Sequence, residues 1–575
     1  MTCNEKEKNA LLNFKHGLSD PSKRLSSWSN EHDCCRWMGV QCDNITGRVI
    51  ELNLSTPLDS PYMELSGEIS PSLLELKSLI HLDLSLNYFV NTKIPSFFGS
   101  MERLTYLDLS LSGFMGLIPH QLGPKFPAWL KTQSFAKVLT MSNSGISDFA
   151  PRWFWNWTLQ IEFLDLSNNF ISGDLSNMFL NSSIINLSSN HFKGRLPSVS
   201  ANVEVLNIAN NSISGPISSP FLCEGMRFDN KLTVLDVSNN MLSGDLGHCW
   251  IQWQNLIHLN LGSNNFSGEI PNSIGHLLGL ESLILDDNDF YGNIPSSLQN
   301  CSVLKFIDFG NNKLSGTLPS WIWEMQYLMV LRLRSNEFKG SITQKMCQLS
   351  SLIVLDIANN SLSGTIPFCV DEMKTMAGED DFFANPLKYY YGFGFNYNNY
   401  KESLVLVPKG DELEYRDNLI LVRMIDLSSN NLFGTIPFQI SKLTTLRFLN
   451  LSRNRLNGEI PNDMGNMKLL ESLDLSLNKI SGKIPTSTQL QSFEVLSYTG
   501  NPELCGPPLM NNCTKVEQVL ENGNFDGSFI DTSDFYIGMG VGFAAGFWGI
   551  CIAIFFSRTC RHAFFHFFYH LKQLI

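Results

Sequence analysis

The chain has 575 residues, of which 43% are hydrophobic and 17% are charged, and its formal net charge is −13. The hydrophobic fraction is too high for a disordered chain and too low for a protein that crosses a membrane many times. The acidic balance argues against a nucleic-acid-binding surface spread over the whole protein. We therefore expect a folded protein without a nucleic-acid partner.

The first 45 residues have the features of a cap. Residues 5–18 place apolar side chains at helical spacing on one side of an expected helix: Ala10, Leu11, Phe14 and Leu18. Four cysteines surround this helix in the sequence: Cys3, Cys34, Cys35 and Cys42. A stack of repeats exposes apolar core at each end, so we interpret residues 1–45 as the cover of the first end.

A repeat dominates the rest of the chain. From Leu232 the sequence reads LTVLDVSNNMLSG, then LIHLNLGSNNFSGEIP, then LESLILDDNDFYGNIP. One Asn recurs at a step of 24 residues and later resumes: Asn240, Asn264, Asn288, Asn312, Asn336, Asn360, then Asn430, Asn454 and Asn478. Upstream the step is looser, through Asn87, Ser112, Ser144, Asn169, Asn190 and Asn211. With a degenerate unit near Leu52, we count about sixteen repeats over residues 46–370 and 421–489.

The repeat unit L-x-x-L-x-L-x-x-N has a physical interpretation. The x-L-x-L part predicts a short strand whose Leu side chains share one face. Such a unit cannot bury its own apolar side, so neighbouring units must stack and join their Leu rows into one core. The Asn amide can satisfy backbone groups of adjacent turns that would otherwise be buried without partners. The sequence therefore predicts an α/β repeat solenoid of leucine-rich repeats.

The cysteines inside the repeats favour crosslinks over metal binding. Cys223 and Cys249, and likewise Cys347 and Cys369, are about one repeat apart, so each pair can lie on neighbouring coils within bonding reach. Cys301 has no such partner, and we interpret it as a buried apolar residue. No CxxC motif or histidine cluster accompanies these residues, so we expect no metal site and no cofactor.

Three neighbouring repeats depart from the small D-L-S residues that most units place on the concave face. The charged residues that replace them, with two others nearby, are Asp286, Asp287, Asp308, Arg332, Arg334, His258 and Glu281. Stacking brings these columns together, so the sequence predicts an acid–base patch. Two interpretations remain open: a solvated cluster whose charges compensate one another, or a ligand contact.

A long insertion interrupts the repeats at residues 371–420. Asn360 and Asn430 are 70 residues apart, which is one repeat plus about 46 residues. Nine aromatic residues lie between Phe382 and Tyr400, including Tyr389, Tyr390 and Tyr391. Long insertions in compact arrays are commonly functional, and Tyr is favoured at interfaces. The segment is interpreted either as a plug that packs on the solenoid or as a ligand contact.

Several features place the repeats outside the cell. Paired cysteines and eleven N-x-S/T sequons favour the secretory route, the sequons being Asn44, Asn53, Asn156, Asn181, Asn186, Asn210, Asn265, Asn300, Asn359, Asn450 and Asn512. Residues 535–556 carry no charge and are long enough to span a bilayer once. The acidic flank 514–534 and the basic tail 557–575 predict that the tail is cytoplasmic. We expect a single-pass protein of the plasma membrane.

The tail and the membrane span bear on signalling. Nineteen residues after the span cannot hold a kinase, so we expect neither an enzyme nor a chain that signals by its own catalysis. Gly538, Gly542 and Gly546 recur every four residues, which predicts a helix face that pairs closely with another helix. The first residues are polar and lack an apolar signal segment, so we expect that the natural protein begins further upstream.

Three strings carry a family resemblance: NALLNFKHGLSDPSKRLSSW near the start, the repeated L-S-G-x-I-P, and NPELCGPPLMNNC at residues 501–513. Together they resemble the plant leucine-rich-repeat receptor-like proteins, in particular the ethylene-inducing-xylanase receptor group. The resemblance implies a superhelix with an extra lateral sheet and a C-terminal cap at residues 490–513. It also implies disulfides Cys3–Cys34, Cys35–Cys42 and Cys505–Cys513.

The resemblance also implies a function. Such receptors recognise a microbial or apoplastic protein or peptide, use the insertion in ligand or co-receptor contact, and signal through partner leucine-rich-repeat receptor kinases. Two other functions share parts of the pattern: a developmental receptor-like protein, and an inhibitor that binds cell-wall polygalacturonases. The chain departs from the family in having few repeats, and the segment around Gln121-Leu122-Gly123 predicts that a block of repeats is missing there.

Overall fold

The computed structural model describes residues 2–57, 63–89, 94–114, 126–217, 223, 230–378, 388–391, 398–401, 403–408, 412–416 and 418–513. The predicted acidic segment, membrane span and tail at residues 514–575, with Gly538, Gly542 and Gly546, lie outside this part, as does the predicted join at Gln121-Leu122-Gly123. None of the helices in the described part combines the length and apolar character that a membrane crossing needs. Residues Met1–Cys513 form one compact unit.

The N-terminal cap begins with the predicted helix, α1 (Glu5–Gly17), whose Ala10, Leu11 and Phe14 are buried. Asn4 caps it by accepting a hydrogen bond from the Lys6 N–H at 3.0 Å. The short helix η1 (Cys34–Arg36) follows. Strand β2 (Val40–Cys42) then pairs antiparallel with β3, the first strand of the repeats. The cap therefore continues the sheet as well as covering its end.

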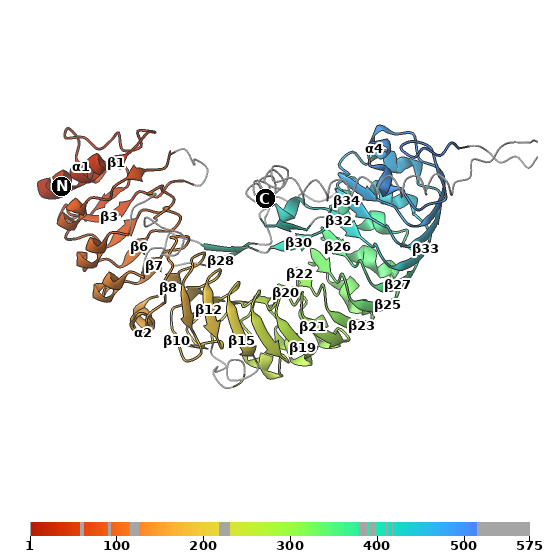
Figure 1. Cartoon of the computed structure of the whole chain (residues 1–575), viewed down its shortest axis with the longest axis horizontal. Coiled ribbons are helices and arrows are strands. Elements are labelled where there is room, and N and C mark those ends of the chain that lie inside the picture. Colours follow the sequence, from red (N-terminus) through yellow and green to blue (C-terminus); the bar gives the residue numbers. More distant parts are fainter. Residues whose placement is uncertain are drawn as a thin grey trace, which may run out of the picture. The chain divides into compact units, whose positions relative to one another are not determined.

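Sixteen short strands of the described residues, one per repeat, pair in parallel in chain order and form the main sheet (Figure 1). They are β3 (Val49–Asn53), β5 (His81–Asp83), β6 (Tyr106–Asp108), β7 (Val138–Thr140), β8 (Phe163–Asp165), β11 (Ile184–Asn186), β14 (Val205–Asn207), β16 (Val234–Asp236), β18 (His258–Asn260), β20 (Ser282–Ile284), β22 (Phe306–Asp308), β24 (Val330–Arg332), β26 (Val354–Asp356), β32 (Met424–Asp426), β34 (Phe448–Asn450) and β36 (Ser472–Asp474). Leu52 of β3 and the middle Leu or Ile of each of the other strands are buried in one continuous core. The face turned away from this core is called the concave face here.

The sheet is continuous across both irregular regions of the sequence. Strand β6 pairs directly with β7, so the solenoid continues on either side of the segment that contains the predicted join. Strand β26 pairs directly with β32, although the insertion separates them in sequence. Because each coil contacts only its neighbours, the insertion does not interrupt the pairing of the coils on either side of it.

A second, 13-stranded parallel sheet lies at one side of the repeats, as the family resemblance implied. Its strands are β9 (Ser172–Asp174), β12 (His191–Gly194), β15 (Ser212–Pro216), β17 (Met241–Gly244), β19 (Asn265–Glu269), β21 (Asp289–Gly292), β23 (Lys313–Thr317), β25 (Glu337–Ser341), β27 (Ser361–Gly364), β33 (Asn431–Thr435), β35 (Arg455–Gly458), β37 (Lys479–Lys483) and β38 (Glu503–Cys505). In the repeats from β8 onward, the L-S-G part or its equivalent supplies twelve of these strands, and the C-terminal cap supplies β38. The positive φ of Gly316 (85°) shows why glycine closes most of these strands.

Short helices form the return segments of most coils. They are η3 (Pro71–Glu75), η4 (Ser96–Ser100), η5 (Ala128–Thr132), α2 (Arg152–Trp157), η6 (Thr158–Gln160), η8 (Cys249–Gln252), η9 (Asn272–His276), η10 (Ser296–Asn300), η11 (Ser320–Glu324), η12 (Gln344–Gln348), η13 (Val370–Glu372), α3 (Lys374–Ala377), η14 (Leu419–Leu421), η15 (Phe438–Lys442), η16 (Asn462–Asn466), α4 (Thr488–Gln491) and η17 (Val495–Ser497). Two small strand pairs complete the repeats: β1 (Leu18–Ser19) with β4 (Ser66–Gly67), and β10 (Phe179–Leu180) with β13 (Ser198–Val199).

The recurring Asn has the predicted role. The Asn264 Nδ2 donates to the carbonyl oxygens of Val237 in the preceding repeat at 3.1 Å and of Gly262 at 3.0 Å. Its Oδ1 accepts from the Leu242 N–H at 3.0 Å. Where Ser replaces Asn, the hydroxyl still reaches the preceding coil, as from Ser112 to the Leu84 carbonyl at 2.6 Å, and it also contacts the Ser110 carbonyl of its own coil at 3.2 Å. The side chain thus joins each main strand to its neighbour.

Five disulfides occur in the described residues: Cys3–Cys34, Cys35–Cys42, Cys223–Cys249, Cys347–Cys369 and Cys505–Cys513. Two of them tie neighbouring coils, and the other three lie in the caps. Cys301 is buried and outside any disulfide, as predicted, and burial raises the pKa of its thiol to about 11. Its thiol is therefore unreactive near neutral pH.

Candidate ligand-binding cavity

The common D-L-S residues of the strands have a local structural role. In β16, the Asp236 Oδ1 accepts hydrogen bonds from both the N–H and the hydroxyl of Ser238, at 3.1 and 2.6 Å. This arrangement turns the chain at the end of the strand and holds the acid close to the backbone. A change at these two positions therefore alters both the turn and the charge of the concave face.

The predicted charged residues of β20 to β24 meet as an ion cluster. Arg332 Nη1 lies 3.0 Å from Asp308 Oδ1 and 3.3 Å from Asp286 Oδ2. Arg332 is 4% exposed and Asp308 is 3% exposed, so these two residues do not form the solvated cluster of the first interpretation. Room for the guanidinium comes from Gly310, where a Cβ would lie only 2.6 Å from Arg332 Nη1. Gly310 stands where most repeats have Ser, and its lack of a side chain is what lets Arg332 lie across the strands.

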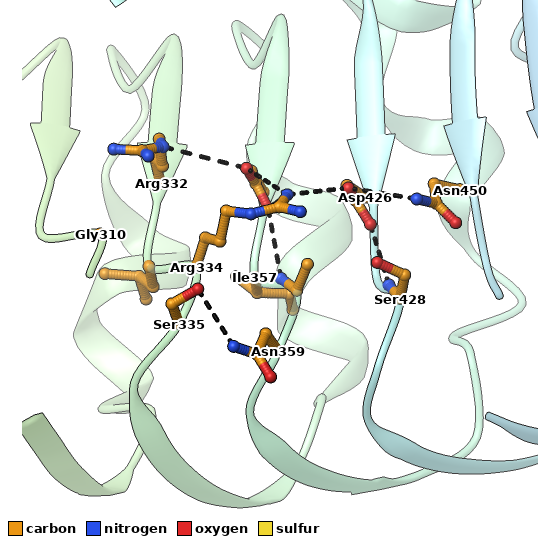
Figure 2. A network of polar contacts seen from close by, with 12 residues as sticks. Gly310, Arg332, Arg334, Ser335, Ile357, Asn359, Asp426, Ser428 and Asn450 are labelled. Carbon is orange, nitrogen blue, oxygen red and sulfur yellow. Dashed lines mark hydrogen bonds and ion pairs between the residues drawn. The ribbon is translucent and has the colours of Figure 1, made fainter. Parts of the chain in front are cut away.

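Arg334 forms a second cluster, shown in Figure 2, with two acids that we did not predict. Its Nη1 lies 3.2 Å from Asp356 Oδ2 and 3.0 Å from Asp426 Oδ2. Asp356 also lies 4.0 Å from Arg332 Nε, so it links the two arginines. Asp426 is further held by the Ser428 N–H at 2.9 Å. The two clusters form one network, which we call the arginine network: Asp286, Asp308, Arg332, Arg334, Asp356 and Asp426.

The arginine network holds four carboxyl groups against two guanidinium groups. Burial, followed by the nearby charge of Asp308, raises the pKa of Asp286 well above its usual range. Burial, followed by the charge of Asp356, raises the pKa of Asp426 to about 6. Burial also raises the pKa of Asp308, although Arg332 opposes this. The acids are therefore only partly compensated by their own arginines.

The remaining charged positions of the predicted patch do not join the network. Glu281 stands one residue before β20 begins, and Lys305 stands one residue before β22 begins. Their charged groups pair at 2.6 Å. Asp287 lies in the turn after β20 with a positive φ of 51°, and its Oδ1 accepts from Asn311 Nδ2 at 2.7 Å. His258 is buried at the start of β18. The patch is thus three separate groups, of which only the network is extensive.

Part of the insertion packs on the concave face. Strands β30 (Leu404–Leu406) and β31 (Leu413–Tyr415) form an antiparallel hairpin. Its Leu404 and Leu406 are buried with apolar side chains of the main sheet: Ile284, Phe306, Val330, Val354, Met424 and Phe448. The described hairpin therefore behaves as the plug of our first interpretation. Tyr389, Tyr390 and Tyr391 belong to β28 (Lys388–Tyr391), which pairs with β29 (Asn398–Lys401).

The hairpin and the repeats border a cavity of about 680 Å³ that is partly open to solvent. Its floor is formed by the concave face from β8 to β22, where the residues after the strands are small and leave the space: Ser188, Ala209, Ser238 and Gly262. The hairpin contributes Ser403, Val405, Glu414 and Arg416. Asp286 and Asp308 lie in its lining, so the arginine network forms part of the wall. A mostly polar cavity with two independent walls is the strongest candidate for a binding site here.

Comparisons with known proteins agree with the fold. The family described as "Leucine rich repeat N-terminal domain" matches residues 4–43. The family described as "Leucine Rich Repeat" matches residues 160–182, 255–277, 279–301, 303–325, 351–373, 445–467 and 469–489. Receptor-like protein EIX2 of Solanum lycopersicum is 52% identical over 124 residues, 21% of this chain and 12% of that protein. Receptor-like protein EIX1 of Solanum lycopersicum is 37% identical over 297 residues, 46% of this chain and 26% of that protein.

The chain is a plant leucine-rich-repeat receptor-like protein. Its matches span well under two thirds of the length of either tomato relative. Two solved structures share the fold of this receptor-like protein. The plant peptide hormone receptor RGFR1 in complex with RGF2 has a TM-score of 0.55 at 24% identity, over 76% of this chain and 65% of that one. The Arabidopsis receptor kinase HAESA has a TM-score of 0.52 at 23% identity, over 89% of this chain and 100% of that one.

Two parts of the candidate site were not predicted from the sequence. Asp356 and Asp426, which belong to the arginine network, stand in ordinary D-I-A and D-L-S units, so nothing in their own repeats marks them. A signal for Asp356 was present in the preceding repeat, because Arg332 stands in register with Asp356 on the neighbouring strand. The hairpin residues Glu414 and Arg416 had no such signal, since an insertion has no repeat register to place it.

Proposed function

We propose that this receptor-like protein binds an extracellular microbial protein or peptide in the cavity under the hairpin and signals in plant defence. The observation that carries the proposal is the cavity itself, because one wall is the repeat array and the other is a separate segment. Two walls allow a ligand to be held by both elements at once. A plug that only sealed the core would leave no such space above a polar floor.

The comparisons with known proteins also support a receptor function. The tomato relatives are both named receptor-like proteins. The HAESA structure holds the peptide hormone IDA together with the co-receptor SERK1. By analogy, our proposal includes leucine-rich-repeat receptor kinases as signalling partners at the plasma membrane, with the repeats outside the cell. The glycine face at Gly538, Gly542 and Gly546 is the membrane part of that contact.

A photo-crosslinking experiment tests the cavity as the ligand site. A photoreactive amino acid replaces Asn239, an exposed residue of the cavity lining, in the full chain expressed in leaves. The matched control replaces Tyr327, which is 59% exposed and outside the cavity lining. Extracellular fluid from infected tissue is added before illumination.

We expect a crosslinked extracellular protein or peptide from the Asn239 position and not from the Tyr327 position. A defence response that needs both the chain and the recovered ligand would complete the test. Equal recovery at both positions, or a recovered ligand without any defence response, would contradict the proposal.

A further inference from the structure

The charged residues that line the cavity are strongly unequal in sign. Among the described residues of the lining, four are acidic, namely Asp236, Asp286, Asp308 and Glu414, and one is basic, Arg416. Arg416 already pairs with Glu414 within the hairpin, with Arg416 Nε 2.9 Å from Glu414 Oε1. No described residue of the hairpin supplies a cation to Asp286 or Asp308, whose described cation is Arg332.

The two arginines of the arginine network are not available to an incoming anion. Arg332 is 4% exposed, and its Nη1 is taken by Asp308 and Asp286. The Arg334 Nη1 is taken by Asp356 and Asp426. To bind either arginine, an anionic ligand would have to displace buried carboxylates. The free energy lost from the buried ion pairs would exceed the free energy gained from the new contact. Negative charge is in excess at this end of the cavity, and a cation is the complementary partner.

Asp286 is the acid best placed to bind a cationic group of a ligand. Its Oδ2 accepts from Arg332, while its Oδ1 lies against Gly262, where any Cβ would overlap it. Gly262 itself lines the cavity. No residue in the described part of the chain donates a hydrogen bond to Asp286 Oδ1. One oxygen thus anchors the carboxylate, and the other lies over the cavity floor with its lone pairs unused.

Two amides add donors to the floor, one on β18 next to β20 and one on β14, three strands from β20. Asn207 and Asn260 stand at the third strand position, and each Oδ1 accepts the N–H two residues on, at 3.0 Å. Their Nδ2 groups have no hydrogen-bond partner among the residues that the structure describes. Both residues line the cavity. An extended peptide offers carbonyl oxygens that such donors can bind.

We propose that the cavity binds an arginine-bearing segment of an extracellular peptide, with its guanidinium on Asp286 Oδ1 and its backbone carbonyls on the amides of Asn207 and Asn260. This assignment rests on the proposed function and names the chemistry of the ligand. Arginine fits better than lysine, because its planar guanidinium is more weakly hydrated than an ammonium group and holds its donors in a fixed orientation. The site therefore selects a basic ligand.

The probe is a fluorescein-labelled peptide, Gly-Arg-Gly-Arg-Gly-Gly, added to the purified full chain, with binding followed by fluorescence anisotropy. Its control carries citrulline in place of each arginine, which keeps the shape and removes the charge. We expect the citrulline peptide and the Asp286→Asn variant each to lose about tenfold in affinity, the loss of one charge-assisted hydrogen bond. Asp289→Asn is the matched variant, because Asp289 is an acid outside the cavity that pairs with Lys313 at 2.6 Å.

A second variant distinguishes a lost binding contact from misfolding caused by the Asp286→Asn substitution. Gly262→Ala closes the space beside Asp286 Oδ1 without changing any charge, and it should weaken the arginine peptide as well. Equal binding of the two peptides, or unchanged binding by both variants, would overturn the assignment. If the arginine peptide fails while Asn239 still crosslinks to a ligand, the charge assignment falls and the proposed function stands.

Discussion

Arg334 reaches across β26 to Asp426, which lies 92 residues later in the chain, and the two side chains approach within 3.0 Å (Figure 2). The insertion lies between these residues in sequence. The ion pair therefore fastens the repeats before the insertion to the repeats after it. The hairpin of the insertion packs on the same strands, so this contact also supports the surface on which the hairpin lies.

Removing Arg334 should destabilise this region. The Arg334→Met variant leaves Asp356 and Asp426, both fully buried, without their shared cation. Breaking a buried pair on one side costs about 3 kcal/mol of the free energy of unfolding. Chemical denaturation of the wild type and the variant measures the loss. Arg416→Met is the control, because its pair with Glu414 is exposed and should contribute little; equal losses in both variants would refute the role of Arg334.

The stability of the N-terminal repeats should depend on pH through Asp108. Burial, followed by the charge of Asp83, raises the pKa of Asp108 to about 7 from its usual 3.8. The folded state then holds a proton that the unfolded state has lost, so stability falls as the pH rises from about 4 to about 7. Asn occupies the equivalent position in β11, β14 and β18.

We therefore expect Asp108→Asn to raise the melting temperature at pH 7.5 and to leave it unchanged at pH 4. Thermal unfolding at the two pH values checks this. Asp289→Asn serves as the exposed control and should change neither value. A variant that is stabilised equally at both pH values would show that burial of the charge is not the cause.

The eleven sequons should differ in occupancy. Asn53, Asn186 and Asn450 stand on the strands of the main sheet, where each Oδ1 accepts a hydroxyl hydrogen bond at 2.7 Å from the Ser two residues later. A glycan at these positions would collide with the neighbouring strand, about 4.8 Å away. Asn44, Asn156, Asn265 and Asn300 are exposed in the structure. Mass spectrometry of the glycopeptides should find the exposed positions occupied and the three strand positions empty; a glycan on Asn186 would contradict this.

The membrane glycines give a prediction about partners. Replacing Gly538, Gly542 and Gly546 by Leu should weaken the recovery of a receptor kinase with the tagged chain, because bulky residues keep two helices apart. Co-purification from leaf membranes measures the recovery. Replacing Gly540, which stands two residues from both Gly538 and Gly542 and so on the other side of the predicted helix, is the matched control. Unchanged recovery in the triple variant would reject pairing through this face.

The leucine and asparagine positions predicted most of the fold, because both have a period and a physical reason for it. Leu259 and Asn264, for example, occupy the core and the backbone contacts that their registers require. The charged patch was predicted only in part. Position along the strand shows which side chains share a face, but burial of Arg332 depends on the space at Gly310 and on the acids of the neighbouring strands. Those are tertiary contacts, which one repeat does not encode.

The most direct test of the ligand cavity is hydrogen–deuterium exchange on the full chain with and without the ligand recovered by crosslinking. The account predicts slower exchange in the hairpin at residues 403–416 and in the floor strands from β14 to β20, with no change in the lateral sheet. Protection confined to the lateral sheet or to the caps, with the hairpin and floor unchanged, would contradict it.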